Sequence, residues 1–422
     1  MPAPKKYSRI AVFVISIYGG GLLAGEPAGP SAAPTLTTIY AFSGVAGSSP
    51  AGGLVNHNGS LYGATLAGGA SNQGAVYALT PPGSGGSAWT QTVLYSFTGG
   101  SDGGSCYGNL VFDTQGAIYG VTLAGGSASA GTVFELTPPA VQGGAWTQSV
   151  LHSFTGGADG GSPVGILFGP NGSLYGVATN GGASGFGAAF QLAPPAVTGG
   201  SWTYSVIYSF AGGADGAYPG AGLILGSKGT LFGTTYVGGA SNAGTVFQLT
   251  RPAKAGGPWT ESVIYTFTGG SDGGYPDAAI TAVSSGALFG TTSYGGATQN
   301  GTAFQLTAPT QTGGAWTHTV LHSFVPTTSD GQHPYGALVY LNSALFGTTY
   351  FGGSQDDGAV FVLKPPSGSG GSWTEQVIYN FTGRTTGGNP FGGLLAGPSG
   401  LVYGTTFAGG PIGDGTVFQL TL

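Results

Sequence analysis

An internal repeat, marked by the tryptophans, is the strongest constraint on the fold of this chain. The six tryptophans follow one another at separations of 57, 56, 57, 57 and 57 residues: Trp89, Trp146, Trp202, Trp259, Trp316 and Trp373. A phenylalanine eight residues further on recurs seven times: Phe42, Phe97, Phe154, Phe210, Phe267, Phe324 and Phe381. Self-similarity at a fixed period predicts copies of one supersecondary unit rather than a domain number set by chain length.

Each copy has the pattern of four short strands. From Gly52 to Phe97 the strands are GGLVN, SLYGATL, AVYALT and AWTQTVLYSF, and the turn segments HNG, AGGASNQG and PPGSGGS separate them. In the fourth strand Trp89, Val93, Tyr95 and Phe97 share one parity, which predicts that they share one face of the sheet. With 88 Gly and 26 Pro among 422 residues, helices are disfavoured, while 41% hydrophobic residues suffice for a core.

The two ends of the chain predict a closed ring. The segment TLTTIYAF at residues 35–42 is a fourth strand that lacks the three before it, and GTVFQLTL at residues 415–422 is a third strand that lacks its fourth. Pairing the two completes one blade and removes both free edges, which distinguishes a β-propeller from an open solenoid. The aromatic residue of the second strand occurs seven times: Tyr62, Tyr119, Tyr175, Phe232, Phe289, Phe346 and Tyr403. We therefore predict an all-β, seven-bladed propeller over residues 34–422.

The repeat consensus, GxLYGTTxxGGxxxxGTVFQLTPP followed by GGxWTxSVLYSFTGGxDGGxP, resembles the GloVer tandem repeat of bacterial exported proteins. The Gly-Gly pair after the second strand and the tryptophan downstream are also similar to kelch repeats, whose spacing is nearer ~50 residues. Both resemblances imply a propeller, and neither implies an activity. GloVer proteins often carry a carboxy-terminal sorting segment; since none precedes Leu422, we expect release rather than surface attachment.

Residues 1–33 have the composition of a secretory leader. Lys5, Lys6 and Arg9 precede an apolar run at residues 10–25, and cleavage is expected between Ala24 and Ala33. An uncleaved anchor is the alternative. The expected localisation is therefore secreted or extracytoplasmic, with no membrane association after cleavage, and we expect a monomer.

Charge excludes one class of partner. Only 5% of the residues are charged, and the formal net charge is −6. Such a chain has no basic patch with which to neutralise a phosphate backbone, so nucleic acid is not an expected partner.

The loop after the fourth strand carries an aspartate in five copies, always followed by glycine: Asp102, Asp159, Asp215, Asp272 and Asp330. As an acidic rim these carboxylates could bind Ca²⁺ or a cationic ligand. As Asp-Gly turns they would instead close their own loops, and the repetition favours this interpretation. No cofactor is expected beyond the weak prospect of Ca²⁺ at this rim.

Departures from the consensus indicate where a ligand could bind. The corresponding loop lacks aspartate in the first and seventh copies, and the seventh brings Arg384 close to the point of closure. We predict that a glycan or small-molecule site, if one exists, lies near Arg384, with Tyr335 and Phe391 as stacking platforms. A solvated loop arginine is the alternative.

Other candidate sites fail on their context. GGSDG at residues 99–103 and 269–273 fits a nucleophile elbow, but it connects two strands, without the helix that the motif needs. The histidines share no metal-ligand spacing. Cys106 aligns with a proline of five other copies, which indicates a filler role rather than a nucleophile.

These observations favour an exported, non-catalytic binding or interaction module, with an extracellular glycan or another cell-surface ligand as the partner. The alternatives are a polysaccharide lyase or glycosidase on a propeller scaffold, and a structural envelope protein. An enzyme predicts two carboxylates, or a tyrosine and an arginine, converging at one mouth. Polar departures that cluster on one rim would favour binding or catalysis, and scattered departures would favour a structural role.

Overall fold

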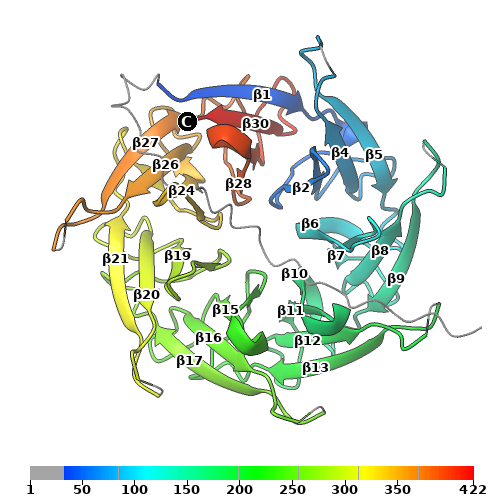
Figure 1. The fold of residues 1–422 in the computed structure, drawn as a ribbon, viewed down its shortest axis with the longest axis horizontal. Coiled ribbons are helices and arrows are strands. Elements are labelled where there is room, and N and C mark those ends of the chain that lie inside the picture. Colours follow the sequence, from blue (N-terminus) through cyan, green and yellow to red (C-terminus); the bar gives the residue numbers. More distant parts are fainter. Residues whose placement is uncertain are drawn as a thin grey trace, which may run out of the picture.

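A computed structural model describes residues 33–422 except 84, 142, 198, 255, 312 and 369. The expected leader lies outside the described residues and stays a prediction. Seven four-stranded antiparallel sheets stand around a central axis (Figure 1), which confirms the predicted all-β propeller. Within the described residues no helix has the length and hydropathy that crossing a membrane requires.

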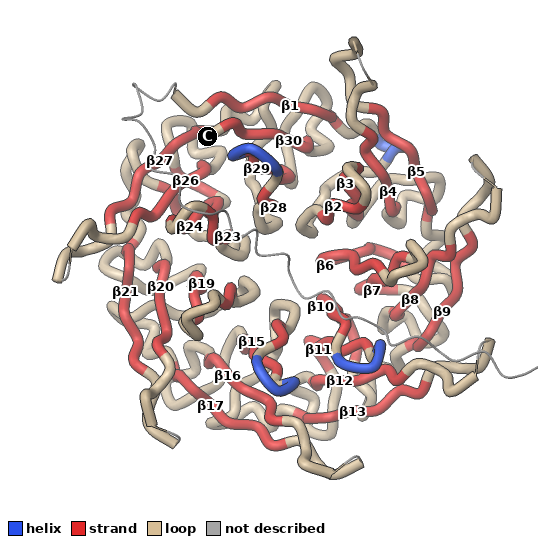
Figure 2. The backbone as a smooth tube through the Cα atoms, in the orientation of Figure 1, coloured by secondary structure: helices blue, strands red, loops and turns tan. Residues whose placement is uncertain are grey.

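Strands of four kinds build the blades, from the axis outward (Figure 2). The innermost strands are β2 (Val55–His57), β6 (Gly104–Phe112), β10 (Gly161–Phe168), β14 (Ile224–Leu225), β18 (Thr281–Ala282), β23 (Val339–Leu341) and β28 (Leu395–Ala396). The second strands are β3 (Ser60–Ala64), β7 (Ile118–Ala124), β11 (Leu174–Asn180), β15 (Leu231–Thr235), β19 (Leu288–Thr292), β24 (Ala344–Thr349) and β29 (Leu401–Thr406).

The third and fourth strands keep a constant length in every blade. The third strands are β4 (Ala75–Thr80), β8 (Thr132–Thr137), β12 (Ala188–Ala193), β16 (Thr245–Thr250), β20 (Thr302–Thr307), β26 (Ala359–Lys364) and β30 (Thr416–Thr421). The outermost strands are β5 (Thr90–Ser96), β9 (Thr147–Ser153), β13 (Thr203–Ser209), β17 (Thr260–Thr266), β21 (Thr317–Ser323), β27 (Thr374–Asn380) and β1 (Thr35–Ala41). A short pair, β22 (Gly331–Gln332) with β25 (Phe351–Gly352), and four 3₁₀ turns complete the fold: η1 (Gly44–Ala46), η2 (Pro170–Gly172), η3 (Ser227–Gly229) and η4 (Pro398–Gly400).

The ring is closed by the two ends of the chain, as the sequence predicts. Strand β1 pairs antiparallel with β30, with Thr35 opposite Thr421 and Ala41 opposite Thr416. In Figure 1 the first strand lies beside the last and completes the blade that also contains β28 and β29. This pairing gives β30 a neighbour on its outer edge, which would otherwise present unpaired backbone groups.

Aromatic rings join neighbouring blades. The phenylalanine that follows each outer strand meets the ring in the third strand of the next blade edge to face, at centroid distances of 5.0–5.3 Å. The seven contacts are Phe42–Tyr77, Phe97–Phe134, Phe154–Phe190, Phe210–Phe247, Phe267–Phe304, Phe324–Phe361 and Phe381–Phe418. All fourteen rings are buried. Tryptophans add a second contact near the outside, such as Trp259 against Tyr175 of the preceding blade at 5.5 Å.

The predicted alternation of the outer strands is wrong beyond one point. Val76 pairs with Tyr95 but Tyr77 pairs with Val93, so Leu94 is the extra residue of a β-bulge. A bulge shifts the alternation by one residue and increases the local twist. Val93 is consequently exposed instead of sharing the buried face with Phe97. The first predicted strand is also shorter than expected, because residues 52–54 lie outside β2 and line the axis.

One blade carries an unsatisfied hydroxyl in this core. Tyr77 occupies the position that is phenylalanine in the six other blades, and its Oη is buried without a hydrogen-bond partner among the described residues. The hydroxyl faces Gly63, where a Cβ would lie 2.4 Å from it. A buried, unpaired hydroxyl costs about 1–3 kcal/mol.

We expect Tyr77→Phe to increase the free energy of unfolding by about 1–2 kcal/mol, because it removes an unpaired polar group and keeps the ring contact. Urea unfolding followed by tryptophan fluorescence measures the change. The matched variant Phe134→Tyr introduces the same hydroxyl in the next blade and should destabilise the protein by a similar amount. A loss of stability in Tyr77→Phe would contradict this account of the core.

Candidate functional site

Seven equivalent residues form a ring at one mouth of the central channel, which we call the channel ring. Each is the first residue after the proline, or Cys106, that ends the loop into an innermost strand: Ala51, Tyr107, Val164, Gly220, Asp277, Tyr335 and Phe391. All seven line a cavity of about 280 Å³ on the axis. Its size is near the lower limit for small-molecule sites.

Glycine lets the innermost segments approach one another around this cavity. A Cβ on Gly52 would lie 2.2 Å from the carbonyl oxygen of Gly108 in the next blade, and a Cβ on Gly392 would lie 2.6 Å from the carbonyl oxygen of Gly52. Side chains at these positions would force the blades apart. Glycine and alanine backbone therefore forms much of the channel wall, and the channel ring supplies its aromatic side chains and its one carboxylate.

The residue two positions before each channel-ring residue has a positive φ. The seven φ values lie between 50° and 58°, at Ser49, Ser105, Ser162, Tyr218, Tyr275, His333 and Asn389. This conformation is unfavourable for non-glycine residues. Hydrogen bonds to two blades hold it: Tyr275 N donates to Ala243 O of the preceding blade at 2.7 Å, and Tyr275 O accepts from Ser293 N of its own blade at 3.1 Å.

Aromatic side chains gather on one arc of this mouth. In the last four copies the positive-φ residues, the channel ring and the segments after the second strands carry ten rings: Tyr218, Tyr236, Tyr275, Tyr294, His333, Tyr335, Tyr350, Phe351, Phe391 and Phe407. Nine of them form one chain of contacts from Tyr236 to Phe407 at centroid distances of 4.7–6.4 Å. We call these nine the aromatic band. The first three copies have Ser49, Ser105 and Ser162 instead of rings.

The structure brings together two of the three predicted ligand-binding residues. The rings of Tyr335 and Phe391 stack at 5.3 Å with an interplanar angle of 20°, and both line the channel. Tyr107 reaches Phe391 from the other side at 6.3 Å. Arg384 is exposed in the loop that leaves the outer strand β27, and it is not among the residues that line the channel.

Asp277 is the one charged residue of the channel ring, and sequence reasoning did not identify it. It is partly buried at the channel wall, and this burial raises the pKa of its carboxyl to about 6. Burial raises the pKa of Tyr107 and of Tyr236, and the negative charge of Asp277 raises both further. The pKa of Tyr335 is raised by burial, by the neighbouring Tyr294 and by Asp277. The charge of Asp277 thus acts on three tyrosines, two of which, Tyr107 and Tyr335, line the same cavity.

The five aspartates of the predicted acidic rim are bonded within their own loops. In the first of these loops Asp102 Oδ2 accepts from Thr98 N at 2.9 Å and from Tyr95 Oη at 3.0 Å. The other four repeat the pattern, with His152 and His322 in the place of the tyrosine in two blades. This geometry is that of a turn closed by its own side chain. Ca²⁺ binding at the rim stays a prediction.

Each loop aspartate and its bonded tyrosine or histidine form a pair, and a side chain from the next blade lies against this pair. Gln148 Nε2 donates to Asp102 O at 3.1 Å, Tyr204 stacks on His152 at 3.7 Å, and His318 stacks on Tyr265 at 4.2 Å. We call this arrangement the interblade junction.

At the junction between the blades of β21 and β27, three potential metal ligands meet. His322 Nε2 lies 3.0 Å from Asp330 Oδ2, and one atom each of His322, Asp330 and Glu375 lie within 4.8 Å of one another. Imidazole and carboxylate groups at this spacing could approach a single ion. Spacing along the chain could not predict the cluster, because Glu375 comes from the following copy. Since hydrogen bonds or ring stacking occupy the same place in other blades, we interpret it as one form of the junction.

Two sequence motifs have no catalytic geometry. Burial raises the pKa of the Cys106 thiol far above its usual value, so no thiolate is available there. The GGSDG segments at residues 99–103 and 269–273 each lead from an outer strand towards the next blade, and no helix follows either of them.

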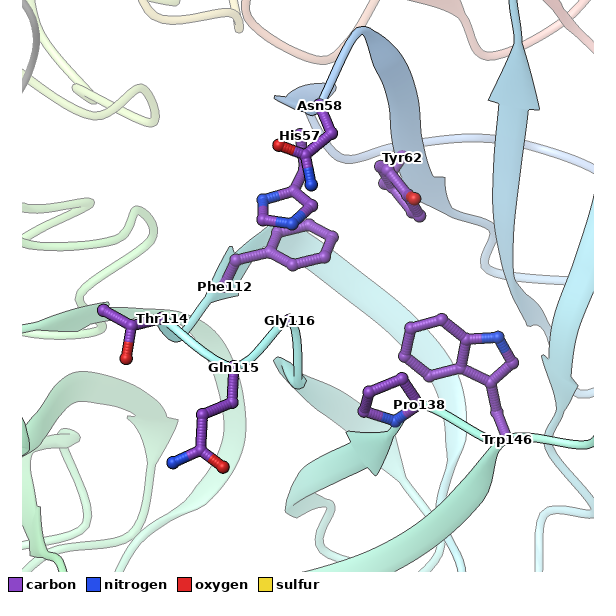
Figure 3. A pocket seen from close by; sticks show the side chains of 9 residues that line it. All are labelled: His57, Asn58, Tyr62, Phe112, Thr114, Gln115, Gly116, Pro138 and Trp146. Carbon is purple, nitrogen blue, oxygen red and sulfur yellow. The ribbon is translucent and has the colours of Figure 1, made fainter. Parts of the chain in front are cut away.

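A second hollow of about 450 Å³ opens at the other end of the innermost strands, between the blades of β2 and β6 (Figure 3). His57 stacks on Phe112 at 4.1 Å, and Trp146 and Pro138 form the other side. Thr114 and Gln115 point away from these rings in Figure 3. Because ligand sites need polar groups that converge, this hollow fits a ligand less well than the channel mouth does.

Comparisons with known proteins agree with the fold. A family model described as the Gloeobacter/Verrucomicrobia repeat matches residues 29–247, 141–324 and 196–418. This match confirms the predicted GloVer resemblance, while the likeness to kelch repeats stays a prediction. No curated protein matches the sequence.

Solved structures resemble the chain at low sequence identity. A putative 6-phosphogluconolactonase from Bacteroides uniformis is 13% identical, with a TM-score of 0.50, over 79% of this chain and 85% of that one. A putative oxidoreductase (glucose dehydrogenase) from Thermus thermophilus is 18% identical, with a TM-score of 0.45, over 74% and 95%. An ulvan lyase, a polysaccharide lyase, is 10% identical, with a TM-score of 0.41, over 80% and 96%. The activities in these names belong to those proteins.

The interblade junction predicts a dependence of stability on pH. Burial, together with the charge of Asp215, raises the pKa of Glu261 to about 7, and its Oε1 is buried without a partner among the described residues. Between pH 4.5 and 7 the folded protein keeps this proton while the unfolded chain releases it. The stability contribution is therefore complete below about pH 4.5 and is lost as the pH rises to about 7.

We expect Glu261→Gln to stabilise the protein by about 1 kcal/mol at pH 8, allowing for partial solvent exposure, and to have little effect at pH 4.5. Gln148 at the equivalent position shows that an amide fits the junction. Urea unfolding at the two pH values measures the difference, and Gln148→Glu should produce the opposite change. An equal effect of Glu261→Gln at both pH values would refute the assignment.

Proposed function

Because the chain belongs to the Gloeobacter/Verrucomicrobia repeat family and closes into a seven-bladed propeller, we propose that it is an exported binding module that holds an extracellular glycan at its channel mouth. One observation carries this proposal. At the positive-φ positions, in the channel ring and after the second strands, nine aromatic residues gather on one arc of one mouth, in the aromatic band, while the first three copies contribute only Tyr107. A purely structural protein gives no reason for such an asymmetry.

The chemistry of this arc suits sugars. Tyr335 and Phe391 offer ring faces, and the tyrosines of the band add hydroxyl groups beside them. Pyranose rings present an apolar face of C–H groups together with a rim of hydroxyls, so aromatic faces beside hydrogen-bonding groups complement them. Tyr294 and Phe351 are each 39% exposed, which leaves ring surface available to a ligand that extends outward from the channel.

A catalytic role has less support. Glycoside hydrolysis uses two carboxyl groups about 5–10 Å apart. Among the residues that line the channel, Asp277 is the one carboxylate, and no arginine accompanies the tyrosines. Arg384, which could have formed a pair with Tyr335, is exposed and is not among the residues that line the channel. Binding without turnover is therefore the function that the mouth supports best.

We expect the double variant Tyr335→Ala and Phe391→Ala to lose at least tenfold in glycan affinity, since each stacked ring contributes about 0.5–1.5 kcal/mol. A glycan array with the full chain, with and without EDTA, identifies the ligand, and titration calorimetry measures the variants. Tyr340→Ala is the matched control, because Tyr340 is an exposed tyrosine on β23 that does not line the channel.

Three outcomes would overturn the proposal. These are the absence of binding to any glycan under either condition, unchanged affinity in the double variant, and an equal loss of affinity in Tyr340→Ala. Release of new reducing or unsaturated ends from a bound polysaccharide would replace the binding module with an enzyme.

A further inference from the structure

Asp277 departs from the consensus by bringing a carboxylate to the channel ring, and no described residue pairs with its charge. In the described residues its carboxylate has neither a hydrogen bond nor an ion pair, and the residues that line the channel include no lysine, arginine or histidine. The carboxylate leans over Gly220 of the preceding copy, where a Cβ would lie 2.4 Å from Asp277 Oδ1. The protein therefore leaves this carboxylate free to pair with a ligand that enters the channel.

The groups around Asp277 limit what that partner can be. Tyr335 lines the same cavity and stacks on Phe391, Tyr107 approaches Phe391 from the far side, and Tyr236 begins the aromatic band. Tyr107 and Tyr335 share the cavity with the carboxylate and bring aromatic rings and hydroxyls to it, and neither carries a positive charge. The chain as a whole has 14 acidic residues against 8 basic ones, which favours the approach of a cation.

A metal ion fits this site poorly. Ca²⁺ takes six to eight oxygen ligands, and Mg²⁺ requires near-octahedral oxygen geometry. The channel ring offers one carboxylate, and its other large side chains are rings and Val164. An organic ammonium group fits better, because it needs only a few hydrogen-bond acceptors and its remaining surface is stabilised by aromatic faces.

We propose that the channel mouth recognises a glycan with a free, protonated amino group, in which the ammonium pairs with Asp277 while the sugar ring lies against Tyr335 and Phe391. This inference rests on the proposed glycan-binding function and adds the class of sugar to it. An N-acetylated sugar lacks the positive charge and leaves the carboxylate unpaired. The free amine is therefore the feature that distinguishes the preferred ligand.

The test compares a glucosamine hexamer with its fully N-acetylated form, by calorimetry on the full chain at pH 6.5 and 150 mM salt, where the amines and Asp277 both carry charge. We expect at least tenfold tighter binding of the free amine. Asp277→Asn should remove this preference, so that the two hexamers bind the variant with equal affinity. Melting temperatures of both proteins show that the variant is folded.

Asp356→Asn is the matched control for the loss of one negative charge. Asp356 Oδ1 accepts from Gly352 N at 2.9 Å, and asparagine makes the same bond in two other copies, at Asn72 and Asn242. This variant should keep the preference for the amine. An equal loss in Asp356→Asn, or equally tight binding of tetralysine, would reveal general attraction of cations and would overturn the inference.

A pH titration adds a second readout. The groups that face Asp277, namely Tyr107, Tyr236 and Tyr335, stay neutral between pH 5 and 7.5, because burial and the nearby carboxylate raise their pKa values. Asp277, with a pKa of about 6, takes up its proton between pH 6.5 and 5, so affinity for the amine should fall several-fold at pH 5, even though more of the amines are protonated there. A preference that is unchanged at pH 5 would contradict the role of Asp277.

The two proposals fail in different ways. If neutral glycans bind through Tyr335 and Phe391 and the amine confers no advantage, the proposed function stands and this inference is wrong. If a small amine such as methylammonium binds as tightly as the glucosamine hexamer, the sugar is not recognised and both are wrong. Both are also wrong if neither hexamer binds and the glycan array is empty.

Discussion

Edge-to-face contact between aromatic rings of neighbouring blades is the interaction on which the rest of this structure depends. With 5% charged residues and a single cysteine, the chain has little besides apolar packing to hold seven sheets in a circle. Seven such contacts, each about 0.5–1.5 kcal/mol beyond the area they bury, sum to a value comparable with the whole net stability of a domain. Phe42 is indispensable to this series, because it brings the first strand into contact with Tyr77 and makes the seventh junction equal to the others.

This mode of packing determines which positions are free to vary. The rings between blades and the glycines of the channel wall recur because each blade must meet its neighbour in the same way. The channel ring is free of this packing constraint, because its residues line the central cavity instead of packing against a neighbouring sheet. Its residues range from Gly220 to Phe391 without disturbing the blades. Specificity can therefore change at the mouth while the architecture stays constant, as is general for sites carried on a repeated scaffold.

The period of the tryptophans is enough to predict the number of blades, the order of their strands and the closure of the ring, because each follows from repetition and from the pairing of edges. The repeat does not predict which residues of the outer strands face the core on each side of the bulge. The bulge at Leu94 is a local gain of one residue that leaves the spacing from Trp89 to Phe97 unchanged, so the sequence carries no sign of it. Tyr335 and Phe391 could be predicted as site residues because each places an aromatic ring where most other copies have a smaller residue.

Asp277 occupies the same column of the alignment as Tyr335 and Phe391, and a comparison restricted to the residue after each proline would have found it. The cluster of His322, Asp330 and Glu375 is different in kind, because its members belong to two copies and only the packing of one blade on the next joins them. Contacts between copies are thus the part of the site that a repeat pattern predicts least well.

Departures from a consensus fall into two kinds: those that a second change at a contacting residue compensates, and those that no other residue compensates. Where Thr386 replaces the loop aspartate, its Oγ1 accepts from Thr382 N at 3.2 Å in the same way, and the residue that the next blade brings to this junction is the apolar Leu36. The change on one side of the junction is thus matched on the other, which is expected of a structural substitution. Asp277 has no such match among the described residues: its neighbours are rings and hydroxyls, and its charge is uncompensated. The fold neither uses nor neutralises this charge, and its place at the convergence of seven blades fits a partner that comes from outside.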